Sequence, residues 1–389
     1  KIVGSQNYQI VIKLINYNKI TGEIFMNNKD KDLFSKFDTL KFVAIIMVIF
    51  IHIVCGKLYQ IEDGKISYEW IISNVIDSFC RSCVPIFVMI SGFFLLGKDE
   101  KITVFFKKRI LKIVPKFLIY SIIFYLFTMI FKNHSFENSM LLKKSIYINF
   151  IKQLLNRKIY YHLWYVYMII SIYLITPVLR KFVFWDREKN FQNTKYLISI
   201  WIFFLIFIPF LNTFLKLNIK IYEQVGEYAG YFLLGYLIGN KKIAIFKNKK
   251  VSIILFFLFN IMIIYLTYIF TKKDGKLFEY FYDYHSIFVF LISIIIFEFA
   301  VNFETKKKKE LNKKVFGLEK FIKIVSAMTF DVYLMHPVFV FFCEKHLINK
   351  INYGKYIIIS FCCVFFLSLF ISLFFYYIKK LLGRGVIWQ

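Results

Sequence analysis

The stretch Phe37–Gly56, FDTLKFVAIIMVIFIHIVCG, is a long apolar run that carries three ionisable groups, Asp38, Lys41 and His52. Its length predicts a membrane helix. Lys41 and His52 are about three helical turns apart, so they share one face with about 16 Å between their Cα atoms, and Asp38 joins that face. An imidazole at membrane depth usually faces a protein interior or a wet cavity, which makes His52 a candidate functional residue. The structural alternative is a histidine hydrogen-bonded to a neighbouring helix.

The composition of the 389-residue chain is that of a polytopic membrane protein. Hydrophobic residues make up 59% of the chain and aromatic residues 21%, and the mean hydropathy is +0.59, well above the values of a soluble domain. The formal charge is +28, but the lysines lie in the gaps between apolar runs, where they set topology and meet anionic lipid. We therefore expect membrane lipid, and not nucleic acid, as the partner of the basic residues.

Apolar runs separated by polar, lysine-bearing gaps predict an all-α fold with about ten transmembrane helices. The run at 225–240 is short for a span, and the run at 322–344 is interrupted by Pro337. The ten runs lie near residues 38–57, 70–97, 113–131, 160–180, 196–215, 225–240, 251–270, 284–301, 322–344 and 355–378.

The distribution of Lys and Arg predicts the orientation of the chain. Ten spans would place both termini on one side of the membrane. With the termini inside, the inner segments carry 33 Lys and Arg and the outer segments carry 16, so the positive-inside rule favours cytoplasmic termini. The outer gap at 132–158 carries six of those 16 and opposes this assignment. It is also the longest predicted external loop.

The domain organisation is expected to be simple. One membrane domain, residues 37–380, lies between a cytoplasmic segment, 1–36, and a cytoplasmic tail, 381–389. The first segment lacks the apolar core of a cleavable signal peptide, so the first membrane helix is expected to act as the targeting signal. Met26 precedes a polar stretch and is a candidate natural start, which would make residues 1–25 a non-native extension.

The second run carries a pair of opposite charges. Asp77 and Arg81 are four residues apart, so they can pair along one helix face. Such a pair is either a structural lock or part of a substrate site. Pro85 is expected to kink this helix, and Ser91 with Gly92 would let another helix backbone approach closely.

Two cations precede the third run on its predicted cytoplasmic side. Arg109 and Lys112 are three residues apart on one helical face. They could hold the phosphates of a nucleotide-like donor, because Arg binds phosphate oxygens in bidentate fashion and Lys acts as a point charge. The simpler interpretation is an ordinary positive-inside flank.

Two further histidines lie in or beside membrane runs. His162 and Trp164 lie at the predicted outer interface, where Trp164 is expected to be an aromatic anchor and His162 could meet an acceptor arriving from outside. His336 precedes Pro337, which frees the carbonyl of residue 333, so that some other donor must satisfy this carbonyl. No metal-ligand pattern or nucleotide-binding glycine motif is present, and no metal or tightly bound cofactor is expected.

Six short motifs together resemble the membrane-bound acyltransferase 3 family, in the expected order from about residue 36 to residue 378. The stretch HLWYVYMIISIYLITPVLRK is most similar to the branch that O-acetylates enterobacterial common antigen and related surface polysaccharides. The family commonly has two arginines in its third-helix motif, whereas Lys112 here keeps the charge without the bidentate geometry. The motifs are Lys41 followed after ten residues by His52, Pro85 to Leu95 (PIFVMISGFFL), Arg109-x-x-Lys112, His162-Leu-Trp-Tyr, Tyr231-Phe-Leu-Leu-Gly-Tyr and Tyr333-Leu-Met-His336.

The resemblance implies a bacterial inner-membrane enzyme that moves an acyl group, commonly acetyl, from cytoplasmic acyl-CoA to a cell-envelope glycan or similar acceptor. Acetyl-CoA would be a co-substrate. His52 is then the candidate catalytic residue, as general base or transient acyl carrier, and Lys41, Arg109 and Lys112 are the candidate donor-binding residues. The candidate site-lining residues are Asp38, Asp77, Arg81, Ser91, His162, Trp164 and His336.

A second class of protein fits the intramembrane charges: a transporter or flippase for a lipid-linked glycan, in which these charges line a path. Such proteins often have pseudo-symmetric halves. No internal symmetry is visible in the sequence, and the charged motifs concentrate early in the chain, which favours an active site.

Overall fold

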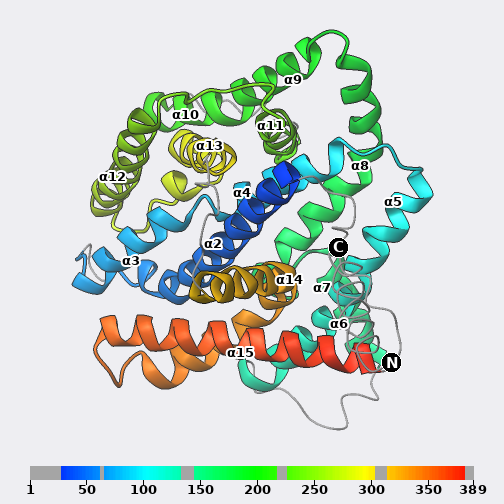
Figure 1. Ribbon diagram of the computed structural model, residues 1–389. Coiled ribbons are helices and arrows are strands. Elements are labelled where there is room, and N and C mark those ends of the chain that lie inside the picture. Colours follow the sequence, from blue (N-terminus) through cyan, green and yellow to red (C-terminus); the bar gives the residue numbers. More distant parts are fainter. Residues whose placement is uncertain (1–27, 62–64, 133–143, 217–225, 303–312, 382–389) are drawn as a thin grey trace. The chain divides into compact units, whose positions relative to one another are not determined.

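The computed structural model describes residues 28–61, 65–132, 144–216, 226–302 and 313–381, and every regular element within these ranges is a helix (Figure 1). The candidate start at Met26 lies outside the described residues. The elements are α2 (Asn28–Leu58), α3 (Tyr68–Cys80), α4 (Cys83–Leu96), α5 (Ile102–Lys108), α6 (Ile110–Phe127), η2 (Thr128–Lys132), α7 (Lys144–Leu155), η4 (Tyr161–Leu163), α8 (Trp164–Asp186), α9 (Gln192–Ile202), η5 (Phe203–Phe207), α10 (Ile208–Leu215), α11 (Ala229–Gly239), α12 (Lys249–Asp274), η7 (Tyr280–Tyr282), α13 (Ile287–Asn302), α14 (Lys313–Leu347) and α15 (Tyr353–Leu381).

Nine helical segments within the described residues are long and apolar enough to cross a membrane. This confirms the predicted all-α, polytopic fold. The remaining predicted span, at residues 225–240, corresponds to α11, whose 11 residues make about 16 Å of helix, roughly half the thickness of the hydrocarbon core. Because α11 is too short to cross alone, the placement of both termini in the cytoplasm stays a prediction.

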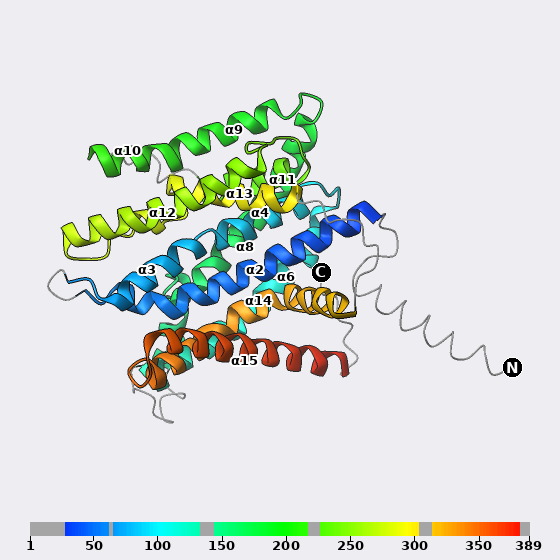
Figure 2. The ribbon, with the colours of Figure 1, turned by 60° about the vertical axis from the view of Figure 1, so that its left-hand side comes forward.

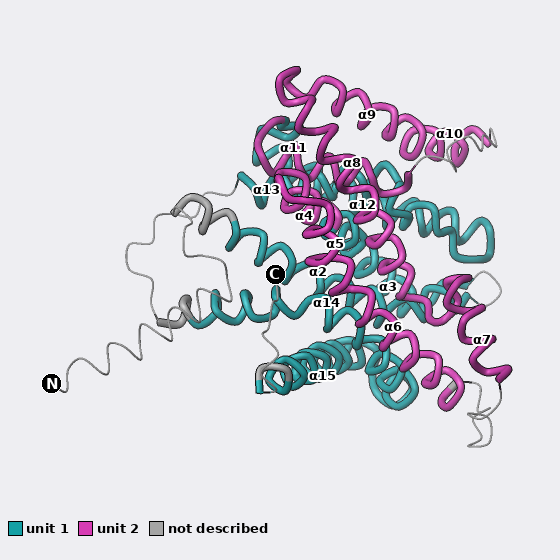
Figure 3. Tube along the Cα trace, turned by 90° about the vertical axis from the view of Figure 1, so that its right-hand side faces the viewer, with its two compact units in different colours: residues 1–87, 243–389 teal, residues 88–242 magenta. Residues whose placement is uncertain are grey.

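The chain forms two compact units, and each is described by itself. Unit 1 consists of residues 1–87 and 243–389, and unit 2 of residues 88–242 (Figure 3). In unit 1, α2 lies between α3 and α14, and it also packs against α15 (Figure 2). A helix that is apolar on all sides is stable where neighbours or lipid cover every face, and residues 42–51 of α2 form such a stretch.

Trp70 fixes the register of the hairpin formed by α2 and α3. Its side chain is fully buried, and its indole N–H donates to the carbonyl oxygen of Leu58 at 3.0 Å. Ser67 caps α3 by accepting a hydrogen bond from the backbone N–H of Trp70 at 3.1 Å. On the other side of α2, the Tyr356 hydroxyl of α15 donates to the carbonyl of Ile53 at 3.4 Å. The contact between Trp70 and Leu58 therefore fixes which residues of α2 and α3 lie at the same level along the two helices.

The second predicted span is interrupted where Pro85 predicts a kink. α3 ends at Cys80, Arg81 and Ser82 form a turn, and α4 begins at Cys83. Proline has no backbone N–H, so Pro85 cannot bond the carbonyl of Arg81, four residues earlier. The helix breaks at that residue, and this confirms the predicted kink.

Two glycines let helices α4 and α11 pack closely in unit 2. A Cβ on Gly92 would overlap the carbonyl oxygen of Phe232, and a Cβ on Gly235 would overlap the carbonyl oxygen of Met89. The close backbone approach predicted at Ser91 and Gly92 is thus confirmed, and α11 supplies the second backbone. Small residues are the usual means by which membrane helices approach this closely.

Candidate active site

The imidazole of His52 faces a second imidazole. The ring centroids of His52 in α2 and His336 in α14 are 5.0 Å apart, with their planes tilted by 35°. His336 is fully buried, whereas His52 is partly exposed. We call these two residues the histidine pair. Both belong to unit 1, so their contact is internal to one compact body.

The hydrogen bond made by His336 determines which of its ring nitrogens carries the proton. Nδ1 of His336 lies 2.6 Å from the carbonyl oxygen of Tyr333. A carbonyl oxygen only accepts hydrogen bonds, so Nδ1 is the donor and Nε2 is the basic nitrogen of the neutral ring. The carbonyl of Tyr333 is the one that Pro337 leaves without its helical N–H partner. The sequence predicted that this carbonyl needs another donor, and His336 supplies it.

Asp77 and Arg81 form the ion pair that their spacing predicts. Nε of Arg81 donates to Oδ2 of Asp77 at 2.5 Å, and the Asp77 side chain is fully buried. The Arg81 guanidinium also lies 4.5 Å from the ring centroid of Tyr282, a cation–π contact. We call Asp77 and Arg81 the charge pair.

Tyr282 is itself held in place by a buried amide. Its hydroxyl donates to Oδ1 of Asn74 at 2.6 Å, and Nδ2 of Asn74 donates to the carbonyl of Ile264 at 3.0 Å. Asn74 and Tyr282 are both buried. These contacts tie α3 to α12 and η7, so the surface on which Arg81 rests is rigid.

Lys41 lies on the same helix as His52, as predicted, because α2 is continuous between them. Its Nζ lies 3.4 Å from Oδ1 of Asp38, and both side chains are partly exposed. The Ser326 hydroxyl of α14 donates to the same oxygen of Asp38 at 2.6 Å. Asp38 therefore connects Lys41 to α14, the helix that also carries His336.

The candidate cations Arg109 and Lys112 belong to unit 2, and one expectation about them is wrong. Arg109 does not lie inside a helix: with φ −116° and ψ −63° it forms the junction between α5 and α6. Lys112 follows one turn later, where its backbone N–H donates to the carbonyl of Arg109 at 3.3 Å. Local spacing cannot reveal such a junction, because no proline or glycine marks it.

The segment that precedes α5 is fixed by a buried arginine. Arg180 of α8 donates from Nε to the carbonyl of Leu95 at 2.7 Å and from Nη2 to Oε1 of Glu100 at 2.9 Å. Burial opposes the charged form of Glu100, but the hydrogen bond and charge of Arg180 and the charge of Lys108 outweigh it and lower the pKa of this carboxyl. Burial and the nearby charge of Arg109 both lower the pKa of Lys98.

The remaining unit 2 candidates are set among aromatic rings. His162 is fully buried, with its ring centroid 4.7 Å from that of Phe124 and 5.6 Å from that of Tyr160. The ring centroids of Trp164 and Tyr228 are 6.0 Å apart. Ser91 hydrogen-bonds to the side chain of Tyr173 in α8. The structure thus encloses His162 in protein, and its predicted position at the outer interface stays a prediction.

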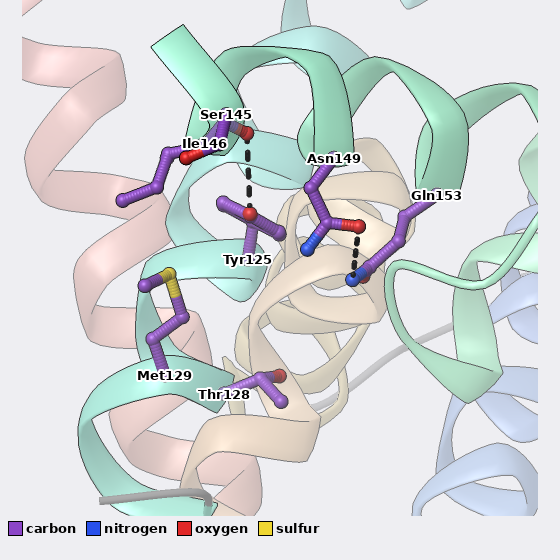
Figure 4. Close-up of a pocket in the computed structure, with 7 residues that line it drawn as sticks. All are labelled: Tyr125, Thr128, Met129, Ser145, Ile146, Asn149 and Gln153. Carbon is purple, nitrogen blue, oxygen red and sulfur yellow. Dashed lines mark hydrogen bonds between the residues drawn. The ribbon is translucent and has the colours of Figure 1, made fainter. Parts of the chain in front are cut away.

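A cavity of about 390 Å³ lies between α6 with η2 and the helix α7. The predicted external loop at 132–158 contains α7, which has no buried residue and is joined to α6 by the Tyr125 hydroxyl, 3.2 Å from the carbonyl of Ile146. Figure 4 shows Asn149 and Gln153 side by side on α7, with Nε2 and Oδ1 3.5 Å apart. The seven lining residues carry no formal charge: Tyr125, Thr128, Met129, Ser145, Ile146, Asn149 and Gln153.

Three residues that build the site in unit 1 were not predicted. Tyr282, Asn74 and Ser326 act through contacts between helices that are distant in the sequence. A polar residue inside an apolar run was the only available signal, and Asn74 gives that signal. Ser and Tyr are too common in membrane helices to stand out.

The fold and these groups define a multi-pass membrane protein with a polar centre of histidines and an ion pair inside its helices. Residues 34–377 match the family model of an acyltransferase domain. The chain therefore belongs to the membrane-bound acyltransferase 3 family, which favours an enzyme over a transporter. No curated protein and no solved structure matched the chain in two further comparisons.

Proposed function

We propose that the chain transfers an acetyl group from cytoplasmic acetyl-CoA to a hydroxyl group of a cell-envelope glycan, in the inner membrane of a bacterium. The observation that carries this proposal is the histidine pair at membrane depth in a chain of the acyltransferase 3 family. Acyl transfer to a hydroxyl needs a base, and imidazole is the side chain best suited to that task near neutral pH.

His52 is the group that we assign to the reaction, and His336 positions it. Tyr333 holds the proton of His336 on Nδ1, so Nε2 of His336 can accept a hydrogen bond from the neighbouring imidazole. An N–H of His52 directed to that acceptor leaves the other His52 nitrogen unprotonated. This nitrogen either takes the proton of the acceptor hydroxyl or attacks the thioester and carries the acyl group.

The donor site that we propose has two ends. Lys41 lies about 16 Å from His52 along α2, so a long pantetheine arm could place a thioester near His52 while the phosphates remain near Lys41. Arg109 and Lys112 stay predicted phosphate ligands, and together with Lys98 they make the segment around α5 of unit 2 positively charged. Acyl-CoA carries several phosphates, and such cations are its natural ligands.

For the acceptor, we infer a neutral polyhydroxylated glycan. The cavity between α6 and α7 supports this choice, because the described side chains that line it include amides and hydroxyls and none of them is charged. Amides and hydroxyls both donate and accept hydrogen bonds, which suits sugar hydroxyl groups. An anionic glycan would need a cation in the lining.

The test uses the purified full chain in liposomes with radiolabelled acetyl-CoA and a panel of envelope glycans. We expect label to enter a glycan with wild-type protein and not with His52→Ala. His346→Ala is the matched control, because it removes an exposed histidine of the same unit, and it should transfer label at the wild-type rate. Equal transfer by the His52 variant would exclude the assignment, and glycan translocation without acylation would favour a transporter.

A further inference from the structure

We propose that Arg81 stabilises the negative charge that develops on the acyl carbonyl oxygen during transfer. This inference rests on the proposed function and adds to it a second reacting group, one turn of helix away from a carboxylate that holds it. The alternative is a purely structural ion pair at the end of α3, since the two residues are one helical turn apart. Its depth, its orientation and its unsatisfied atoms favour a catalytic role.

The charge pair and the histidine pair lie at the same depth. α2 and α3 run antiparallel, and the hydrogen bond from Trp70 to Leu58 sets their register. From this contact, His52 lies six residues back along α2, about 9 Å, and Asp77 lies seven residues along α3, about 10.5 Å. The two helices pack against each other. Arg81 lies one turn further, and its side chain reaches back to Asp77.

Arg81 is held so that its outer nitrogens remain available. Nε is the only nitrogen of Arg81 with a hydrogen-bond partner among the described residues. The ring of Tyr282 supports the guanidinium plane at 4.5 Å, and the side chain keeps 18% of its surface exposed. Nη1 and Nη2 thus present N–H donors from a fixed position, which is the arrangement that stabilises a developing oxyanion most strongly.

Asp77 gives an independent indication that the charge pair faces a ligand. Its Oδ1 atom is buried and has no hydrogen-bond partner among the described residues, although a buried carboxylate oxygen normally has one. A purely structural ion pair would normally have both carboxylate oxygens satisfied. A group that enters with a hydroxyl proton would satisfy the second one.

The acceptor hydroxyl oxygen attacks the thioester carbon while the unprotonated nitrogen of His52 takes the hydroxyl proton. The carbonyl π electrons move onto oxygen, and Arg81 stabilises this oxyanion. When the carbonyl re-forms, the carbon–sulfur bond breaks, and His52 returns the proton to the leaving thiolate of coenzyme A. No oxidant, reductant or metal is required.

The proposal is tested in the full chain in liposomes with three variants: Arg81→Gln, Arg81→Lys and the double variant Asp77→Asn/Arg81→Gln. Removing the arginine alone leaves a buried carboxylate unpaired, which destabilises the fold. The double variant removes both charges and avoids this loss. We expect the double variant to fold, to keep the KM for acetyl-CoA within about twofold, and to lose about 100- to 1,000-fold in kcat, the usual effect of losing an oxyanion donor.

Arg81→Lys keeps the positive charge but not the planar fork. Its kcat should fall between that of the wild type and that of the double variant. Lys57→Gln is the matched control, because Lys57 pairs with Glu69 across the same two helices at 3.7 Å, and it should keep the wild-type kcat.

The outcomes separate this inference from the proposed function. If wild-type protein transfers no label, the proposed function is wrong. If wild-type protein transfers label and the double variant or Arg81→Lys does so at the same kcat, the charge pair is a structural lock and the inference is overturned. A selective loss of kcat in both variants supports it.

Discussion

Pro337 offers a test in which a more stable protein should be a slower enzyme. Pro337→Ala returns a backbone N–H to the interior of α14, and this N–H competes with His336 Nδ1 for the carbonyl oxygen of Tyr333. A neutral hydrogen bond contributes about 0.5–1.5 kcal/mol. If His336 loses its hydrogen bond to this carbonyl, the preference of its ring for the Nδ1–H tautomer weakens by about two- to twelvefold, since about 1.4 kcal/mol corresponds to a factor of ten.

We therefore expect kcat to fall by up to about tenfold in Pro337→Ala, because the basic nitrogen of His336 no longer faces His52 all of the time. The unfolding temperature should rise, since an interior proline costs a helix up to about 3 kcal/mol relative to alanine. Both quantities are measured on the full chain in liposomes, kcat from the transfer of labelled acetyl groups and unfolding from a thermal scan.

Pro177→Ala is the matched control for this substitution. Pro177 also lies inside a long membrane helix, α8, and in unit 2. Its replacement should raise the unfolding temperature without lowering kcat. If Pro337→Ala raised the unfolding temperature and left kcat at the wild-type value, the hydrogen bond to Tyr333 would have no role in the reaction.

Three further predictions address packing, pH and the acceptor. Gly92→Ala should destabilise the fold by about 1–3 kcal/mol, because its Cβ overlaps a backbone carbonyl. In the control Gly317→Ala the new Cβ meets open space, so the thermal unfolding temperature should stay unchanged or rise. Equal effects of the two substitutions would refute the close packing of α4 against α11. The pKa of Glu100 lies below its usual value of 4.5, so its ionised form contributes stability that is complete above pH 4.5 and is lost as the pH falls through the folded-state pKa. Glu100→Gln should lower the unfolding temperature at pH 7 and less so in acid, and a uniform loss at every pH would contradict this. Asn149→Ala with Gln153→Ala should raise the KM for a neutral glycan several-fold and leave the KM for acetyl-CoA unchanged; an increase only in the latter would place the acceptor elsewhere.

Local sequence pattern predicted what depends on neighbours along the chain. Apolar run lengths gave the membrane helices, and the four-residue spacing of Asp77 and Arg81 gave their ion pair. Pro337 predicted an unsatisfied carbonyl at residue 333, because the missing N–H is a property of proline alone. Gly92 predicted a close backbone contact for a similar reason.

Contacts between distant helices could not be predicted in the same way. Nothing in either apolar run indicates that His52 and His336 meet, because membrane helices associate through shape and small residues on all faces. The support of Arg81 by Tyr282 depends on η7, some 200 residues later in the chain. The junction at Arg109 arises without a helix-breaking residue. Such features depend on tertiary packing, which overrides local propensity.

We propose that the imidazole of His52 takes part directly in the transfer, as the base for the acceptor hydroxyl or as the acyl carrier. The most direct measurement is the rate at which His52→Ala transfers labelled acetyl groups with and without added imidazole, together with its affinity for acetyl-CoA. We predict that the variant binds acetyl-CoA as the wild type does, that its kcat falls by at least about 100-fold, and that free imidazole restores part of the rate. A variant that keeps its kcat would contradict the account, as would one that loses activity only because it no longer binds acetyl-CoA.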